Sequence, residues 1–469
     1  MFDLLVKQVH VEDPVNGISG VRDIAIEDRR IANVCEEIAG DSAKTVLDLE
    51  GNIAIPGIID PHVHICGEFG NPTGFPMLVK AGVCTAFNLA GPVEAAWECI
   101  PYGCGLNLAT LEDATLGRRI DSNHLKQSAV DAFIDTALEA GALGIKILGG
   151  HHPLTPETSE RIIRSTFRSG GYASWHAGST CSGSNIEGMR EVMELVGDTH
   201  VHIAHINSYC RGQIYHELAE VMEALELLEN HPSVLSESYI AAVNGTHLAI
   251  GDDGRLVSHS TRISFNCLGY SDDEKGVASA IKDGKAYVLV VRGGETISIT
   301  GDEGVAAWYE AETHIAGSLN VNPPMGRIAL AVARRSSGDF SVDALSTDGG
   351  SIPRNVLVSQ GLALVAVGVL TMSEYVRKIS YNASRMLSLR NKGHLGIGAD
   401  ADISVLNFAN RKAVATIIGG EVCMVNGYVC GKGGTAIITE RGSRAIKKRG
   451  LSYYCTDVSH GPLPFRQGL

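Results

Sequence analysis

The 469-residue sequence lacks three features that would place it in other classes of protein. It has no excess of positive charge, because 39 Lys and Arg face 53 Asp and Glu for a net charge of −14, which argues against a nucleic-acid partner. No apolar run is long enough to span a bilayer, so no membrane partner is expected. The first residues, MFDLLVKQVHV, lack the basic segment, long apolar stretch and cleavage site of a signal peptide.

The 11 cysteines also lack any C-x-x-C pair or regular spacing. Scattered thiols without a secretion signal are typical of a reducing compartment, so we expect a cytoplasmic protein rather than a disulfide framework. What the sequence does have is 44% hydrophobic residues, enough for one large domain and a smaller one.

The order of strand-like and helix-like segments predicts an α/β fold in two domains. Residues 1–55 resemble short β-strands between Gly, Asp and Asn turns, and a similar set returns at 393–440, so both chain ends can build one small β-domain. Over 56–392, apolar strand-like runs alternate with helical patterns, which is typical of βα units around a parallel sheet.

Two helices and two departures from this alternation are expected. Residues 128–140 carry apolar positions at helical spacing, with Ser128 as the N-cap, and 212–230 form the clearest amphipathic helix. An insertion at about 255–345, with a hairpin that turns at Gly293-Gly294, is expected to cover the site. The tail 441–469 is expected to be a C-terminal extension on the surface or an arm onto a neighbouring subunit.

The segment IPGIIDPHVH places His62 and His64 at the end of an apolar, strand-like run. Residues two apart in a strand point to the same face, so both imidazoles can reach one metal ion. The pair alone is weak evidence, because HVH recurs at His200 and His202. The remaining ligands must come from elsewhere in the chain.

Four further candidate ligands lie at or near the ends of predicted strands: Lys146, His176, His205 and Asp348. The carboxyl ends of strands are where a (β/α)8 barrel places its active site. Lys146 lies inside the apolar segment GALGIKILGG, where a bare ammonium is costly, and a carbamate would turn its amine into an anionic metal ligand. His202 is an alternative to His205, since the two point to opposite faces of the strand.

Together these motifs resemble the amidohydrolase superfamily over nearly the whole chain. PGIIDPHVH is similar to its first-strand motif, GIK, WHAGS, IAHINS and STDGG follow in the family's order, and GHLGIGADADISVLN resembles the return into its β-domain. The resemblance implies a (β/α)8 TIM-type barrel over 56–392 with a small β-sandwich built from 1–55 and 393–440.

The same resemblance implies two divalent metal ions, with zinc as the expected metal. The implied ligands are His62, His64 and Asp348 for one ion, His176 and His205 for the other, and a carboxylated Lys146 that bridges them together with a hydroxide. The metals would lower the pKa of the bound water and polarise the scissile carbonyl. Asp348 would be the catalytic residue that passes the proton to the leaving nitrogen.

Two branches of the family fit different parts of the chain. The scaffold resembles N-acyl-D-amino-acid deacylases (D-aminoacylases) through ALEAGALGIKILGGHHPLTPE, SESYIAAVNGTHL and TDGGSIPRN. That branch has a cysteine on its second strand and a small residue in place of Lys146. Here GVCTAFNLAGP has Ala90 or Gly91 near the cysteine position, and its Cys84 is expected in the core. The metal ligands instead resemble those of hydantoinases, dihydropyrimidinases and dihydroorotases, which open cyclic amides.

The candidates for substrate binding are His151, Arg211 and Tyr239. Arg211, in SYCRGQ after the sixth strand, is the arginine best placed for a substrate carboxylate. Three other arginines are weaker candidates for this role and are expected in solvent: Arg262, Arg292 and Arg354. The tyrosine that ring-opening enzymes place after the lysine is absent, and His151 or His152 would polarise the carbonyl there or be a loop residue. Tyr239 would donate to a substrate oxygen or pack inside the barrel.

We therefore expect a metal-dependent hydrolase of non-peptide C–N bonds that opens a cyclic amide or ureide by attack of a metal-bridging hydroxide. The alternative is a deacylase of linear N-acyl-D-amino acids. A non-catalytic relative is a minor alternative, because such relatives typically lose metal ligands and all six positions are filled here. The expected partners are a small-molecule amide substrate and further copies of the chain in a homo-oligomer.

Overall fold

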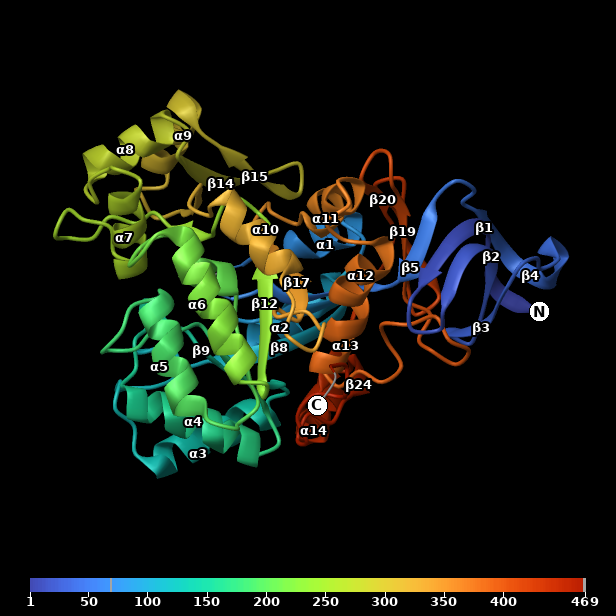
Figure 1. The fold of residues 1–469 in the computed structure, drawn as a ribbon, viewed down its shortest axis with the longest axis horizontal. Helices are drawn as coiled ribbons and strands as arrows, with labels where there is room; N and C mark the ends of the chain where they lie inside the picture. The colour runs from blue at the N-terminus through green and yellow to red at the C-terminus, as the bar shows by residue number, and fades with distance from the viewer. Residues whose placement is uncertain (68–69, 467–469) are drawn as a thin grey trace.

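The computed structural model describes residues 1–67 and 70–466. Short parallel strands from the middle of the chain form a barrel at its centre (Figure 1). In chain order they are β6 (Ile58–His64), β7 (Val83–Asn88), β8 (Asn107–Asp113), β9 (Gly144–Ile147), β10 (Tyr172–Trp175), β11 (Val201–Ile203), β12 (Val234–Tyr239), β17 (Ala344–Ser346) and β18 (Gly349–Gly350). β17 pairs with β12 and β18 pairs with β6, so these two pieces of one strand close the barrel across Thr347 and Asp348.

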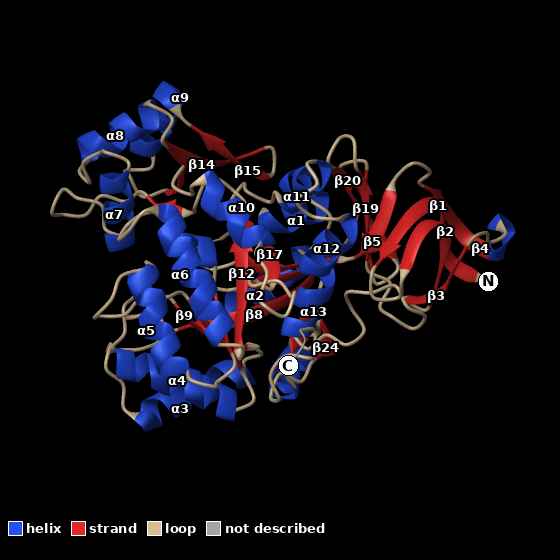
Figure 2. Cartoon of the chain, in the orientation of Figure 1, coloured by secondary structure: helices blue, strands red, loops and turns tan. Residues whose placement is uncertain are grey.

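Helices lie around the outside of the barrel (Figure 2). They are α1 (Gly74–Lys80), α2 (Val93–Cys99), α3 (Gln127–Glu139), α4 (Pro156–Arg168), α5 (Ile186–Val196), α6 (Glu217–Asn230), α10 (Pro324–Val332), α11 (Leu357–Ala366), α12 (Met372–Val376) and α13 (Asn382–Met386). The barrel strands are covered on both faces, and every residue of β7 is accordingly buried. The main core lies between the strands and this helical layer.

Two details of the helices differ from the prediction. α3 begins at Gln127, so Ser128 lies in its first turn and the prediction of Ser128 as the N-cap is wrong. α6 begins at Glu217, because the preceding residues form a loop whose backbone N–H groups at Gly212, Ile214 and Tyr215 all donate to the buried carboxylate of Glu220.

A second sheet is built from both chain ends and lies at one side of the barrel (Figure 1). Its strands are β1 (Phe2–Asp13), β2 (Ile18–Glu27), β3 (Arg30–Cys35), β4 (Ala43–Asp48), β5 (Ile53–Pro56), β19 (Ile403–Asn407), β20 (Lys412–Ile418), β21 (Glu421–Val425) and β22 (Tyr428–Val429). β1 pairs with β4 along its first half and with β5 along its second, so the sheet folds over its own apolar core. This arrangement confirms the fold class: a TIM-type barrel with a small β-sandwich from both termini.

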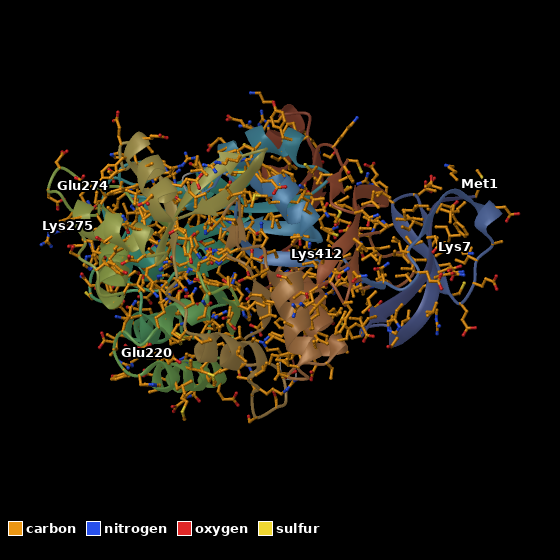
Figure 3. All side chains as sticks on the ribbon, turned by 90° about the horizontal axis from the view of Figure 1, so that it is seen from above. Met1, Lys7, Glu220, Glu274, Lys275 and Lys412 are labelled. Carbon is orange, nitrogen blue, oxygen red and sulfur yellow. The ribbon has the colours of Figure 1, made fainter. Side chains whose placement is uncertain are left out.

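The interruption of the βα alternation is a separate four-stranded sheet with its own core. It contains β13 (Thr246–His247), β14 (Ala286–Arg292), β15 (Glu295–Ile299) and β16 (Ala316–Leu319), with α7 (His259–Cys267), α8 (Glu274–Lys282) and α9 (Gly301–Glu310). The predicted hairpin joins β14 to β15, and Gly293 and Gly294 both have positive φ at its turn. In Figure 3, Glu274 and Lys275 of α8 lie at the opposite end of the molecule from Lys7 of β1.

The C-terminal segment adds two strands beside the barrel sheet. β23 (Thr435–Ile438) pairs with the first half of β8, and β24 (Ser452–Cys455), which follows α14 (Ser443–Lys448), pairs with β23. Arg466 is buried, forms an ion pair with Asp343 and donates to the carbonyls of Pro232 and Val234 at the amino ends of strands. Most side chains of 441–466 are exposed or half-buried, so this segment lies on the outside of the barrel, and buried residues such as Arg466 anchor it there; residues 467–469 lie outside the described part. Within the described residues, no helix is both long and apolar enough to cross a membrane.

Candidate active site

The carboxyl ends of the barrel strands bring the predicted ligands to one place. His62 and His64 lie at the end of β6, His176 follows β10, His205 follows β11, and Asp348 lies in the break between β17 and β18. This is the end of the barrel where the loops after the strands converge.

Asp348 is the anion of this cluster. Its Oδ1 lies 2.9 Å from His64 Nε2 and 3.3 Å from His62 Nε2, and its Oδ2 lies 2.7 Å from Arg354 Nη2. Burial opposes ionisation of Asp348, but the charge of Arg354 and the nearby histidines outweigh it and hold the pKa of this carboxyl well below its usual range. Asp348 is therefore a carboxylate at neutral pH.

Two of the candidate ligands have left-handed backbone conformations. Asp348 has φ +51° and His205 has φ +38°, both costly for residues with a Cβ. The surrounding structure holds both: the Asp348 N–H donates to His62 O at 2.8 Å, and the His205 N–H donates to Glu237 Oε1 at 2.6 Å. Strained ligands that the structure holds in this way are characteristic of functional sites.

The histidine rings continue in a chain from β6 towards the loop after β9. The ring centroids of His62 and His205 are 5.2 Å apart, those of His205 and His176 are 4.4 Å apart, and those of His176 and His151 are 5.0 Å apart. The structure thus brings His151 beside the ligands.

A serine fixes the tautomer of His176. Ser184 Oγ donates to Ala177 O at 3.0 Å and lies 2.9 Å from His176 Nε2. When its single proton is donated to the carbonyl, the hydroxyl accepts from the Nε2–H of His176. Nδ1 of His176 then keeps a lone pair for a metal.

The residues present fit a divalent metal ion. Ligand atoms of His62, His205 and Asp348 all lie within 4.8 Å of one another. Burial lowers the pKa of His64, and lowers those of His176 and His205 well below the usual value, so these imidazoles are neutral and can ligate. Neutral imidazole with carboxylate is a donor set that suits Zn²⁺.

Lys146 lies beneath this cluster, inside β9. It is 1% exposed, and its ammonium donates to Ser174 Oγ on the neighbouring strand at 3.2 Å. Burial lowers the pKa of Lys146 to about 7, against the raising effect of Glu237 and Asp348. A large share of this amine is therefore neutral near pH 7.

The structure separates His202 from His205. His205 belongs to the ligand cluster, whereas His202 is buried on β11 and pairs across the strands with Ser174 and Leu235. Within the described residues neither ring nitrogen of His202 has a hydrogen-bond partner, and its Nε2 lies 3.9 Å from Glu237 Oε1. The geometry thus favours His205 over His202 as a ligand.

Two buried carboxylates beside the ligands were missed from the sequence. Glu237 on β12 and Asp60 on β6 are both fully buried. Asp60 accepts hydrogen bonds from the backbone N–H groups of His62 and Thr347 and from the Thr347 hydroxyl, and burial raises its pKa to about 7. The argument applied to Lys146, that a charged residue in a strand needs a partner, would have marked both.

Arg211 and Tyr239, two of the three substrate candidates, belong to one polar group after β11 and β12. Arg211 donates to Asn322 Oδ1 at 2.8 Å, to the Tyr239 hydroxyl at 3.0 Å and to Ser208 Oγ at 3.1 Å. The Tyr239 ring lies 6.4 Å from that of His205. Arg211 and Tyr239 therefore adjoin the ligand cluster.

The expectation for Arg354 is wrong, whereas the expectation for Cys84 is confirmed. Arg354 is 2% exposed and has its guanidinium 4.7 Å from the Tyr239 ring, so its expected solvation is wrong; Asp348 and two backbone carbonyls satisfy it. Cys84 is a core thiol, as expected, and faces Ser404 of the small β-domain.

Comparisons with known proteins agree with this architecture. A family model, the Amidohydrolase family, matches residues 53–423. A dihydroorotase of Syntrophus aciditrophicus (strain SB) is 25% identical over 435 residues, which cover 86% of this chain and 89% of that protein. Among solved structures, D-aminoacylase with its binuclear metal centre aligns with a TM-score of 0.63 at 15% identity, over 93% of this chain and 100% of that one. D-hydantoinase aligns with a TM-score of 0.59 at 12% identity, over 93% and 98%.

Proposed function

This chain belongs to the amidohydrolase family, as a hydrolase of non-peptide C–N bonds, and on that premise we propose that it opens a cyclic amide or ureide. The observation that carries the proposal is Lys146, a buried lysine beneath a cluster of neutral histidines and one carboxylate. The carboxyl end of β7, where a deacylase would carry a cysteine, continues here as Leu89, Ala90 and Gly91. The extended similarity to a dihydroorotase supports the same choice.

We propose that the chain holds two divalent ions with the six candidate ligands. His62, His64 and Asp348 would hold one ion, His176 and His205 the other, and Lys146 as a carbamate would bridge both. When bound, the two ions, zinc being the expected metal, would supply hydroxide near neutral pH and polarise the scissile carbonyl. The lowered pKa of Lys146 favours the carbamate, because the neutral amine is the form that captures carbon dioxide.

Asp348 would carry the proton. Arg354 holds its Oδ2, so Oδ1, which faces His62 and His64, remains the oxygen available on the side of the reaction. A carboxylate kept ionised in this way accepts a proton and releases it readily to the leaving nitrogen. His151, whose ring lies beside that of His176, would donate to the carbonyl oxygen of the substrate.

Arg211 and Tyr239 would recognise the substrate. Among the described residues the hydrogen-bond partners of Arg211 are neutral groups, so its charge is available to a carboxylate. A ring that bears a carboxylate would place this group at Arg211 and its amide at the histidines. An N-acyl-D-amino acid offers the same two groups, and this keeps deacylation as the second candidate.

A panel of two substrate classes tests the proposal. Zinc- and bicarbonate-loaded protein is incubated with cyclic amides (hydantoins, dihydropyrimidines, cyclic imides) and separately with N-acyl-D-amino acids, and both substrate loss and primary-amine release are recorded. Ring opening consumes the substrate without freeing an amine, whereas deacylation frees one. We expect turnover of a cyclic substrate that is lost in Lys146→Ala.

Two other results of this experiment would replace the proposed function. Amine release from the acyl panel would replace ring opening by deacylation. Absence of turnover together with absence of stoichiometric metal would make the chain a non-catalytic relative. A 13C carbonyl signal after loading with labelled bicarbonate, absent from Lys146→Ala, would identify the carbamate directly.

We also propose that the chain works as a homo-oligomer in the cytoplasm. All 11 cysteines are free thiols, which suits a reducing compartment. Light scattering on the purified protein measures the assembly, and a monomer at micromolar concentration would contradict it.

A further inference from the structure

We infer that Glu237 is a positioning residue that sets the ligands of both metal ions at once. The inference builds on the proposed metal-dependent function. Glu237 lies on β12, is 0% exposed, and receives three hydrogen bonds from three other parts of the barrel. The donors are His62 Nδ1 at 2.7 Å, the backbone N–H of His205 at 2.6 Å, and the Ser346 hydroxyl.

The first bond fixes the tautomer of His62. Oε1 of Glu237 accepts this bond, so Nδ1 of His62 carries the proton. Nε2 then has the lone pair, and it is the nitrogen that faces Asp348 Oδ1 at 3.3 Å. Hydrogen bonds of this kind orient a ligand ring and raise its basicity towards a metal.

The second bond fixes the backbone at His205. This residue has φ +38°, a conformation that a side chain with a Cβ rarely adopts. The charge-assisted bond from its N–H to Glu237 Oε1 offsets that cost and aims the imidazole at His62 and His176. The same oxygen, Oε1, therefore holds a ligand proposed for each ion.

The third bond reaches the strand that carries Asp348. Ser346, two residues before Asp348, donates to the other oxygen of Glu237. One carboxylate thus joins β6, the turn after β11 and β17. Replacing it should disturb both metal positions together, whereas a residue of merely structural importance would lower stability and leave metal affinity unchanged.

Glu220 provides a matched control. It is also 0% exposed and accepts from three backbone N–H groups, at Gly212, Ile214 and Tyr215. It lies on α6, one of the helices around the barrel (Figure 2), and is labelled in Figure 3. Glu220→Gln therefore replaces a buried carboxylate that, like Glu237, accepts three hydrogen bonds, but it does not contact a proposed metal ligand.

The experiment measures zinc stoichiometry and zinc affinity, by competition with a chromogenic chelator, in wild type, Glu237→Gln, Glu237→Asp and Glu220→Gln. The absorption spectrum of the cobalt-loaded forms reports ligand geometry. We expect zinc affinity to fall about 10- to 100-fold at both sites in the two Glu237 variants, with an altered cobalt spectrum. Glu220→Gln should lose thermal stability but bind zinc as wild type does.

Three results would decide against parts of this reasoning. Wild-type zinc affinity in folded Glu237→Gln and Glu237→Asp would overturn the inference while leaving the proposed function intact. A wild-type protein that takes up no zinc would overturn both. If the Glu237 variants do not fold, Ser346→Ala, which removes one bond, must still lower zinc affinity, and an unchanged affinity there would overturn the inference.

Discussion

Replacing Arg354 by methionine should remove the charge that holds Asp348 in place. The guanidinium contacts Asp348 twice, through Nη2 to Oδ2 at 2.7 Å and through Nε to the backbone oxygen at 2.6 Å. Both partners are buried, at 2% and 7% exposed. Methionine fills similar space without charge, so the variant leaves an uncompensated carboxylate in the interior.

The size of the effect follows from this burial. Breaking a buried ion pair by removing one partner costs about 3–5 kcal/mol. At about 2.1 cal/mol/K per residue, a chain of this length has an unfolding entropy of about 1 kcal/mol/K, so the thermal midpoint should fall by about 3–5 °C. Turnover should fall as well, because Asp348 is the proposed ligand and proton carrier.

The stability loss in Arg354→Met should depend on pH, in a direction set by the pKa of Asp348. The pKa of Asp348 in the folded state lies below its unfolded value of 3.8, so its ion pair contributes stability that is fully present above that pH and is lost as the pH falls through the folded pKa. In Arg354→Met the Asp348 carboxyl becomes protonated at a higher pH than in the wild type, and protonation removes the cost of burying an unpaired charge. The stability gap between wild type and variant should therefore be narrower at pH 5 than at pH 7.

The assay is unfolding of chelator-treated protein by urea and by heat at both pH values. Arg262→Met is the control, because Arg262 makes an ion pair of 3.0 Å with the exposed Asp253 and should cost at most about 1 kcal/mol. A variant of Arg354 that unfolds like the Arg262 variant would refute the reasoning.

Four further outcomes are expected. Burial lowers the pKa of Lys378 to about 7, below its unfolded value of 10.5. Between these pH values this group should therefore raise the free energy of unfolding of the wild type by up to about 1.4 kcal/mol per pH unit. Urea titrations at pH 7, 8 and 9 should show a shallower rise of this free energy in Lys378→Met, and parallel curves for the two proteins would contradict the prediction. Arg466→Met should destabilise the barrel by about 3–5 kcal/mol in denaturant unfolding, since it leaves Asp343 buried without its partner, and a loss under 1 kcal/mol would show that the tail is dispensable. Zinc at 100 times its Kd should raise the free energy of unfolding of the chelated protein by about 2.7 kcal/mol, and the same rise in His62→Ala would argue against that residue as a ligand. Ser184→Ala should weaken zinc binding about tenfold at one site alone, measured by the same chelator competition, and unchanged binding would remove its assigned role.

Local patterns were enough to find the candidate ligands. Each ends or interrupts an apolar strand, where a polar side chain is out of place unless it has a function, and a parallel barrel brings such strand ends together. The same reasoning gave the small β-domain from both termini and the hairpin at Gly293-Gly294, because alternation and turn residues are properties of neighbouring positions.

Other features depend on contacts between residues far apart in the chain. Arg354 looks like a solvated loop arginine until Asp348, Val243 and Tyr239 surround it. Glu237 lies 175 residues from the His62 ring that it holds. Such partners carry no common spacing in the sequence, so no periodicity could reveal them.

The sequence by itself thus determined the fold class and the chemical types of the candidate ligands, since both depend on short-range patterns of burial and polarity. The tertiary structure decided whether His202 or His205 joins the cluster, which carboxylate contacts the rings, and where the basic tail lies. Those choices depend on the backbone turn at His205 and on the charge pairing of buried groups such as Arg466 and Asp343. A buried charge needs its partner in space, and only the folded chain brings the two together.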